Sequence, residues 1–192
     1  MTNNSNKPKI GDDEAKLVDA WADWITERRR EGRRLYLFSF MFTQLPGRPK
    51  TKLMIMQQEL TMIYARMLTR LVRRPKGKPL LELPVWLAFP DRPVPKNDKK
   101  DSLSQIVPND GVHMHAIVAI PKNSRVRKIG AHVRKYRESY LGREGRLVNI
   151  DVRRIRRTPR KATRYALKSL ERQRWDDDQI LVLPRSSTEL SS

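Results

Sequence analysis

The arrangement of apolar and polar residues along the chain predicts alternating helices and strands. Apolar residues at three-and-four spacing predict helices over 12–30 and 51–72, and capping residues predict two more over 124–140 and 158–174. Apolar and aromatic runs bounded by Gly, Pro, Asn or Asp predict strands over 35–43, 80–89, 111–120 and 146–155, with a short edge strand at 180–183. Four prolines and few apolar residues indicate a loop over 90–108.

The order of these elements is one helix followed by β-α-β-β-α-β-α. It predicts an α+β domain built on a small central antiparallel sheet, with helices packed on one face of the sheet and an extra N-terminal helix. We expect an N-terminal tail and helix over 1–33, the folded domain over 34–175, and a flexible C-terminal tail over 176–192.

Two histidines interrupt the most apolar of these strands. His113 and His115 are two residues apart, so they point to the same face of the sheet, while Met114 and Ala116 point to the other. Histidines in such a strand can simply be packed or hydrogen-bonded. Two imidazoles on one face can also share a metal ion, and we take this as the working hypothesis.

A carboxylate near the histidines would complete such a site. If the strands on either side of the 90–108 loop pair as a hairpin, Asp91 lies beside His113 and His115, and Glu82 lies at the far end. Asp98, Asp110 and Glu82 are the alternative third ligands. A set of two imidazoles and one carboxylate suits Mn²⁺, and Mg²⁺ could bind if phosphate oxygens completed its shell.

The last predicted helix carries a tyrosine among cations. Its apolar stripe consists of Ala166, Leu167 and Leu170, and the side chains roughly opposite are Lys161, Tyr165, Lys168 and Arg172. Nearby cations stabilise a phenolate, which is the form that a tyrosine nucleophile needs. Because Tyr165 lies opposite the apolar stripe, we expect this helix to lie along the edge of the sheet.

The charge of the chain is strongly positive and unevenly distributed. The formal net charge is +20, and residues 122–174 hold 19 Lys and Arg against four Asp and Glu. Residues 48–78 hold nine more basic residues against Glu59 alone. Such asymmetry indicates a polyanionic partner, most often nucleic acid. The residues expected to contact its backbone are Arg153, Arg154, Arg156, Arg157, Lys161, Arg164 and Arg172.

Several classes of protein are disfavoured by what the sequence lacks. There is no cysteine, so neither a disulfide framework nor a thiolate zinc site is possible. Residues 1–15 are too polar for a signal peptide, and the longest apolar run, 35–42, is too short to cross a bilayer. No P-loop motif is present. We expect a soluble, cytoplasmic protein with no membrane partner.

The order of the motifs resembles that of the HUH endonucleases, and more closely the Rep-type rolling-circle replication initiators. The motifs are the His-Met-His strand, the strand Val148-Asn149-Ile150-Asp151-Val152-Arg153, and the helix bearing Tyr165 and Lys168. The segment 42–46, Phe-Thr-Gln-Leu-Pro, is similar to the first motif of that family. The resemblance covers roughly residues 34–174.

The resemblance implies nicking and joining of single-stranded or hairpin DNA. His113, His115 and a carboxylate would bind a divalent ion, Mn²⁺ or Mg²⁺, and Tyr165 would attack the phosphate to leave a 5′-phosphotyrosine and a free 3′-hydroxyl. Lys168 would position or stabilise the phosphate, and a separate helicase would unwind duplex DNA. Ser169 and Arg172 stand where family members often have a second Tyr and a later Lys, which favours a single nucleophile.

Other interpretations of the same residues stay open at this point. Tyr136 and Tyr140 lie one turn apart on a basic helix and could form a nucleophile pair, although a structural or DNA-contacting role is favoured. A transposase or relaxase would use the same chemistry. A non-catalytic nucleic-acid-binding protein on this fold, or a basic regulator of duplex DNA, would not depend on Tyr165.

Overall fold

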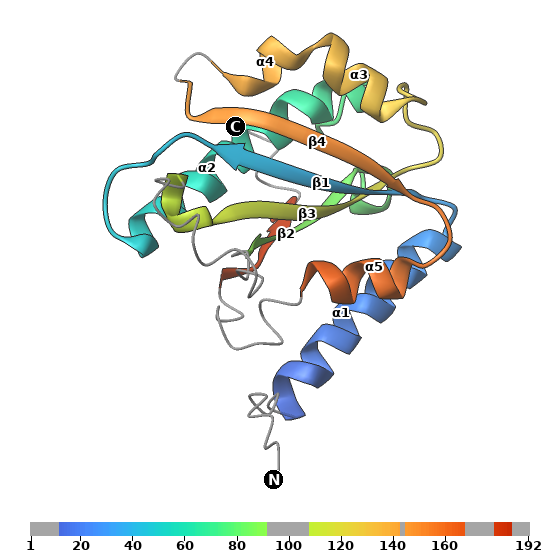
Figure 1. Ribbon diagram of the computed structural model, residues 1–192. Coiled ribbons are helices and arrows are strands. Elements are labelled where there is room, and N and C mark those ends of the chain that lie inside the picture. Colours follow the sequence, from blue (N-terminus) through green and yellow to red (C-terminus); the bar gives the residue numbers. More distant parts are fainter. Residues whose placement is uncertain (1–11, 92–107, 143–144, 168–178, 186–192) are drawn as a thin grey trace, which may run out of the picture.

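A single antiparallel sheet forms the centre of the molecule (Figure 1). The computed structural model describes residues 12–91, 108–142, 145–167 and 179–185. The strands lie in the order β4-β1-β3-β2-β5, with all four neighbouring pairs antiparallel. They are β1 (Arg34–Phe42), β2 (Val85–Asp91), β3 (His113–Ile120), β4 (Leu147–Ile155) and β5 (Leu181–Leu183). The predicted α+β class and antiparallel sheet are confirmed.

Helices cover both faces of the sheet, so the expectation of helices on one face is wrong. The helices are α1 (Asp12–Arg30), α2 (Pro49–Leu71), α3 (Ile129–Lys135), α4 (Arg137–Leu141) and α5 (Pro159–Ala166). Met114 and Ala116 of β3 share a core with α2, α3 and α4, and we call this side the back face. Ile117 and Ala119 share a second core with α1 and α5, and we call this side the front face (Figure 1).

The central strands explain why both faces are covered. β2 is buried at every position, and β3 is buried from Met114 onward apart from His115. Both strands therefore place apolar residues on both faces of the sheet. A strand of this kind must be packed on both sides. On the back face Trp86 is fully buried, with its ring 5.5 Å from those of Phe38 and Tyr64.

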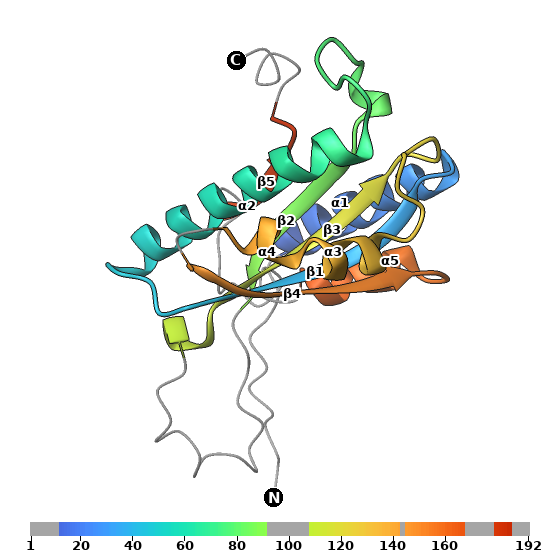
Figure 2. The same cartoon turned by 90° about the horizontal axis from the view of Figure 1, so that it is seen from above.

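The predicted helix over 124–140 is wrong in its first part. Ser124 Oγ and the Arg125 N–H both donate to the carbonyl oxygen of Leu71, at 3.3 and 3.0 Å. This segment therefore satisfies the carboxyl end of α2 instead of starting a helix. The remainder divides into α3 and α4 at Tyr136, and Figure 2 looks down on both as they lie over β4.

The strand predicted over 80–89 is shifted toward the histidine strand. Residues 80–82 form a 3₁₀ turn, and β2 begins only after Pro84. β2 continues through Pro90 to Asp91, so the start predicted for the loop, residue 90, is too early. β5 pairs with β2 only from Trp86 to Ala88, so Pro90 lacks a ladder partner on that side and can sit in the strand. β5 itself is the expected short edge strand, within the segment assigned to the tail.

No helix among the described residues has both the length and the apolar character that crossing a bilayer requires.

Candidate metal centre and the front face

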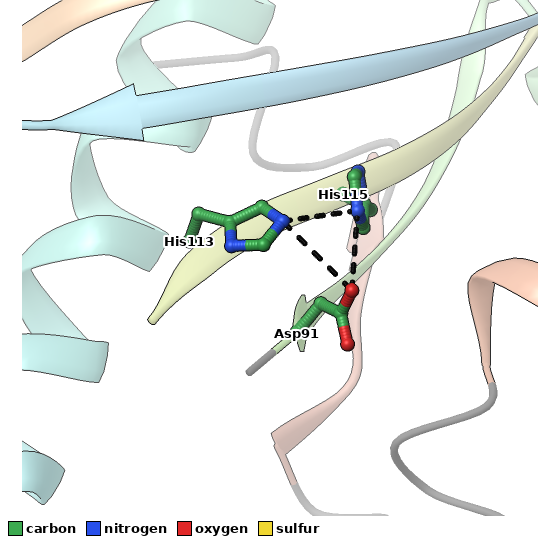
Figure 3. Close-up of side chains that lie close together, drawn as sticks. All are labelled: Asp91, His113 and His115. Carbon is green, nitrogen blue, oxygen red and sulfur yellow. Dashed lines mark hydrogen bonds and ion pairs between the residues drawn. The ribbon is translucent and has the colours of Figure 1, made fainter. Parts of the chain in front are cut away.

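Three side chains at one end of the sheet converge on a common point (Figure 3). Asp91 is the direct antiparallel partner of His113, and both histidines project from the front face of β3. The Asp91 Oδ2 atom lies 3.8 Å from His113 Nε2 and 3.4 Å from His115 Nε2. The two Nε2 atoms are 3.1 Å apart. The register predicted from the hairpin therefore brings the predicted third ligand to the histidines.

The Nδ1 contacts of the two imidazoles turn their Nε2 atoms toward this point. His113 Nδ1 lies 3.1 Å from the carbonyl oxygen of Gly111. Because a carbonyl only accepts, Nδ1 carries the proton and Nε2 keeps its lone pair. Ser39 Oγ lies 2.9 Å from His115 Nδ1, and because a hydroxyl can donate or accept, this contact allows His115 the same tautomer. In that tautomer the lone pairs of both Nε2 atoms and one carboxylate oxygen face one another.

The donor atoms are spaced as ligands of one ion would be. Two donors each about 2.1 Å from an ion are about 3.0 Å apart at a right angle and about 3.4 Å apart at the tetrahedral angle. The separations of 3.1, 3.4 and 3.8 Å lie close to that range. Asp91 is only 2% exposed, and a carboxylate buried to this degree needs charged or hydrogen-bonding partners. The group could hold a metal ion.

The alternative third ligands do not join the group. Asp110 is exposed and pairs with Lys52 at 3.7 Å, and Glu82 pairs with Lys78 at 2.7 Å. Asp98 lies outside the described residues. Within the described part of the chain, the three-residue group of Asp91, His113 and His115 is the one set of His, Asp and Glu that could share an ion.

A tight turn fixes the start of the histidine strand. Asn109 and Asp110 both have left-handed backbone angles, with φ of 56° and 57°, and Gly111 follows at 79°. The Asn109 side chain accepts from the Leu45 N–H at 2.8 Å and donates to the Thr43 carbonyl at 2.8 Å. The turn before β3 is thereby tied to the segment that follows β1.

Sequence reasoning missed Asn109 and Ser39, although each left a signal. Asn109 is buried, although the sequence Asn109-Asp110-Gly111 by itself predicts only a turn. Ser39 is the one polar residue within the apolar run of β1, between Phe38 and Phe40, and it lies opposite His115 in the β1–β3 register. A lone hydroxyl in such a run needs a partner, and here the partner is a candidate ligand.

The predicted nucleophile is carried by α5, which packs on the same face as the imidazoles. Ala166 and Leu167 are buried against the front-face core, whereas Tyr165 is 61% exposed. This is the division predicted from the apolar stripe. The helix lies across the face of the sheet beside α1, however, and not along the sheet edge (Figure 1). Lys168, the predicted partner of Tyr165, lies outside the described residues, as does Arg172.

A basic groove lies between α1 and α5, with Tyr165 in its wall. Its volume is about 850 Å³, and it is lined by Asp23, Thr26, Arg30, Arg157, Thr158, Pro159, Arg160, Lys161, Arg164 and Tyr165. Asp19 of α1 pairs with both Arg160 and Arg164 at 2.9 Å. These ion pairs attach α5 to α1. Lys161 and Arg157 are exposed cations at the groove.

The remaining predicted contacts to DNA divide between the two faces. Arg153 is the pairing partner of Leu37, so it lies on the front face, and its Nε donates to Asp151 at 2.8 Å. Arg154 pairs with Tyr36, a back-face core residue, and so points to the other side. Arg156 and Arg157 are exposed between β4 and α5. The structure therefore does not bring the four arginines into one cluster.

The alternative tyrosines lie on the back face. Tyr140 is 1% exposed, belongs to the back-face core, and its Oη lies 2.8 Å from His132 Nε2. Burial raises the pKa of Tyr140, although Arg70 opposes the rise, and burial with nearby Arg70 and Lys135 lowers the pKa of His132. His132 is half-buried. The sheet separates both tyrosines from the group of Asp91, His113 and His115.

Comparisons with known proteins found no relative of this chain. No family model, no curated protein and no solved structure matches the chain. The function must be inferred from the geometry of the candidate site and from the motifs in the sequence.

Proposed function

We propose that the chain is a metal-dependent single-stranded DNA endonuclease and strand transferase that uses Tyr165 as its nucleophile. The observation that carries the proposal is the convergence of Asp91, His113 and His115 on the face that also bears the Tyr165 helix. The resemblance to Rep-type proteins rests on the same residues in the same order. Initiation of rolling-circle replication of a plasmid or phage is the role that this resemblance favours.

The three ligands fit a divalent ion with open coordination positions. Two imidazoles and one carboxylate bind Mn²⁺ readily, and a substrate phosphate could complete the shell of Mg²⁺. When bound, the ion would polarise the scissile phosphate and offset its charge. Ser39 and the Gly111 carbonyl would hold the imidazoles in the tautomer that presents Nε2 to the ion.

Tyr165 would carry out the bond exchange. Its Oη would form the bond to phosphorus while the bond from phosphorus to the 3′-oxygen breaks. The phenolic proton would pass to solvent, and the leaving 3′-oxygen would take a proton from solvent to become the free hydroxyl. The energy of the phosphodiester would be retained in the 5′-phosphotyrosine, so rejoining would need no ATP. Lys168, one turn further along the sequence, is proposed to steady the phosphate.

The groove between α1 and α5 supports a route for the DNA strand. Its exposed cations, Arg157 and Lys161, would contact phosphates on the way to Tyr165. Arg153 lies on the same face of the sheet. It pairs with Leu37, which is two residues along β1 from Ser39, the partner of His115. These contacts would be independent of base sequence, and a separate helicase would supply single strands from duplex DNA.

A denaturing gel tests the proposed function. Wild-type protein is incubated with a mixed pool of labelled single-stranded oligonucleotides and Mn²⁺ or Mg²⁺, beside Tyr165→Phe and a chelator control. We expect a shifted, protease-sensitive DNA band that both controls lack. Tyr136→Phe is the matched control, because it removes a hydroxyl from the back face and should leave the band unchanged.

The possible outcomes separate the competing functions. A band that survives Tyr165→Phe but not Tyr136→Phe would contradict the assigned nucleophile. Absence of a band on a pool that includes hairpin DNA would favour a binding protein without catalysis. A transposase or relaxase would give the same covalent band, and the sequence of the DNA that is cut would distinguish these roles.

A further inference from the structure

The helix that carries Tyr165 is too short to hold its own position. α5 has eight residues, and isolated helices of fewer than about 12 residues are marginal in water. The apolar residues that it adds to the front-face core are Ala162, Ala166 and Leu167. Two of these offer only a methyl group, and such small side chains fix the rotation of a helix less tightly than large ones that interlock. Other contacts must therefore set the direction in which Tyr165 points.

The contacts that hold α5 in place come from α1. Asp19 accepts from Arg160 Nη2 and from Arg164 Nη1, each at 2.9 Å. The two arginines are one turn apart, so a single carboxylate spans one turn of α5. In the segment that leads into α5, the Arg156 carbonyl oxygen accepts from Arg29 Nη2 at 3.3 Å. The N-terminal helix thus holds α5 along one side and at its entry (Figure 1).

These ion pairs fix the rotation of α5 about its own axis. Successive residues of an α-helix are about 100° apart, so Lys161 and Tyr165 form a second row beside that of Arg160 and Arg164. Both residues of the second row line the groove between α1 and α5. With the first row held by Asp19, the second row stays turned toward the groove. The carboxylate of Asp19 therefore controls where the phenol lies without touching it.

The same contacts change the role expected for Arg164. The sequence predicts that Arg164 contacts the DNA backbone, but in the structure its guanidinium is paired with Asp19. An arginine whose charge is offset by a carboxylate attracts a phosphate less strongly. The cations of the groove then divide into those that hold α5, Arg160 and Arg164, and those left to the strand, Arg157 and Lys161.

We propose that Asp19 is a positioning residue of the nuclease. Through Arg160 and Arg164 it holds the helix that bears Tyr165 in the orientation from which the phenol reaches the phosphate. The inference rests on the proposed function, because this orientation has a chemical consequence only if Tyr165 is the nucleophile. It makes α1 part of the catalytic unit, although the resemblance to Rep-type proteins begins only after this helix, at about residue 34.

Three variants of the full-length protein test the proposal. Asp19→Ala removes the carboxylate, Asp19→Glu is the conservative variant, and Asp13→Ala is the matched control. Asp13 lies on the same helix and carries the same charge, but its partner is Lys16, also within α1. Single-turnover cleavage is measured on an oligonucleotide that the wild type cuts, affinity for oligo(dT) by fluorescence anisotropy, and affinity for Mn²⁺ by calorimetry. Hydrogen–deuterium exchange over residues 159–167 measures the hold on α5 without any cleavage.

We expect Asp19→Ala to slow cleavage about 10- to 100-fold, since a misplacement of about 1 Å can cost about 100-fold in rate. Arg160 keeps its contact with Asp23, so the loss falls mainly on Arg164. Affinity for oligo(dT) should equal that of wild type or rise up to about threefold, because the charge of Arg164 is no longer offset. Affinity for Mn²⁺ should be unchanged. Exchange in α5 should be about threefold faster or more, as expected for the loss of exposed ion pairs.

The other two variants should separate positioning from a general effect of charge. Asp19→Glu should recover most of the cleavage rate and of the protection in α5, because it restores a carboxylate on the same side of α1. Asp13→Ala should match wild type in all four measurements.

Three results would overturn the proposal. An unchanged cleavage rate in Asp19→Ala would show that the ion pairs do not position the nucleophile. A faster rate would show that Asp19 restrains the site by occupying its cations. Equal losses of cleavage, oligo(dT) affinity and Mn²⁺ affinity would show a general loss of structure.

Failure of the proposed function can be told apart from failure of this inference. If wild-type protein forms no covalent band on DNA, the nuclease proposal fails. Exchange in α5 that is faster in Asp19→Ala and restored in Asp19→Glu would still support the hold of Asp19 on this helix. Exchange equal to that of wild type would overturn that hold, whether or not the protein cuts DNA.

Discussion

The two faces of the sheet use the same residue types in opposite ways. On the front face the His113 and His115 imidazoles turn their Nε2 atoms toward each other and toward a carboxylate, at distances of 3.1 to 3.8 Å. On the back face the His132 ring contacts Tyr140 and Tyr136, and the Arg70 guanidinium packs on the Tyr136 ring. One group has donor atoms that converge on a shared point, and the other forms a closed network.

This difference teaches how to separate a candidate site from a structural cluster. Histidine occurs in both groups, so the presence of histidine alone does not distinguish them. What distinguishes them is the placement of the Nε2 atoms, because on the front face two of them lie 3.1 Å apart and both lie within 3.8 Å of the same Asp91 oxygen. On the back face His132 Nε2 is already bonded to a hydroxyl.

The largest expected effect comes from removing a ligand on the front face. Asp91→Asn should lower the affinity for Mn²⁺ by more than about 100-fold and should abolish cleavage. Loss of a residue that only supports a ligand costs up to about 100-fold in metal affinity, and loss of a ligand itself should cost more. Isothermal titration calorimetry with Mn²⁺ measures the change. Asp110→Asn, on the exposed carboxylate paired with Lys52, is the matched control and should bind Mn²⁺ normally. Wild-type affinity in Asp91→Asn would remove this carboxylate from the site.

A smaller effect is expected when the support of one ligand is removed. Ser39→Ala deletes the partner of His115 Nδ1, so the tautomer is no longer fixed, and the affinity for Mn²⁺ should fall about 10- to 100-fold. Ser124→Ala removes a hydroxyl bonded to the Leu71 carbonyl on the back face, and its metal affinity should equal that of wild type. Equal affinity in the two variants would show that Ser39 does not orient the imidazole.

The back-face network should contribute to stability and not to chemistry. Tyr140→Phe removes the hydroxyl bonded to His132, and the free energy of unfolding should fall by about 1 to 2 kcal/mol. Urea denaturation measures the loss, and cleavage per folded molecule should be unchanged. Tyr136→Phe, at an exposed position, should cost less than about 0.5 kcal/mol. A loss of cleavage in Tyr140→Phe would place this network in the mechanism.

The smallest predicted effect is a dependence of stability on pH. Burial lowers the pKa of His132 from its ordinary value of 6.5, so below that pH the unfolded chain binds more protons than the folded chain. The free energy of unfolding should therefore fall as the pH drops below about 6.5, down through the lowered pKa. His132→Gln should flatten this part of the profile, measured by urea denaturation across pH. An identical slope in the variant would contradict the prediction.

The sequence predicts the sheet and the grouping of Asp91, His113 and His115 because both depend on strand periodicity. The alternation of β3 places the two histidines on one face, and the hairpin register brings Asp91 to them. Both inferences need only the period of a strand and the direction of pairing. Whether Tyr165 acts at this site, and on which DNA, stays a prediction.

The features that the sequence does not predict depend on tertiary contacts. Ser124 was expected to start a helix, but its hydroxyl bonds the end of α2, a segment far away in sequence. Arg153 and Arg154 are neighbours in sequence, yet the pleat of β4 sends them to opposite faces. Helices on both faces follow from strands that are apolar on both sides.

Mass spectrometry of the DNA-linked peptide tests the central claim most directly. Wild-type protein is trapped on a cleavable single strand with Mn²⁺, digested with trypsin, and the modified peptide is sequenced. We predict a nucleotide phosphate on Tyr165, in a peptide that begins after Arg164 and is absent when Asp91→Asn replaces wild type. A phosphate on Tyr136 or Tyr140, or an adduct that forms equally in Asp91→Asn, would contradict a metal-dependent nucleophile on the front face.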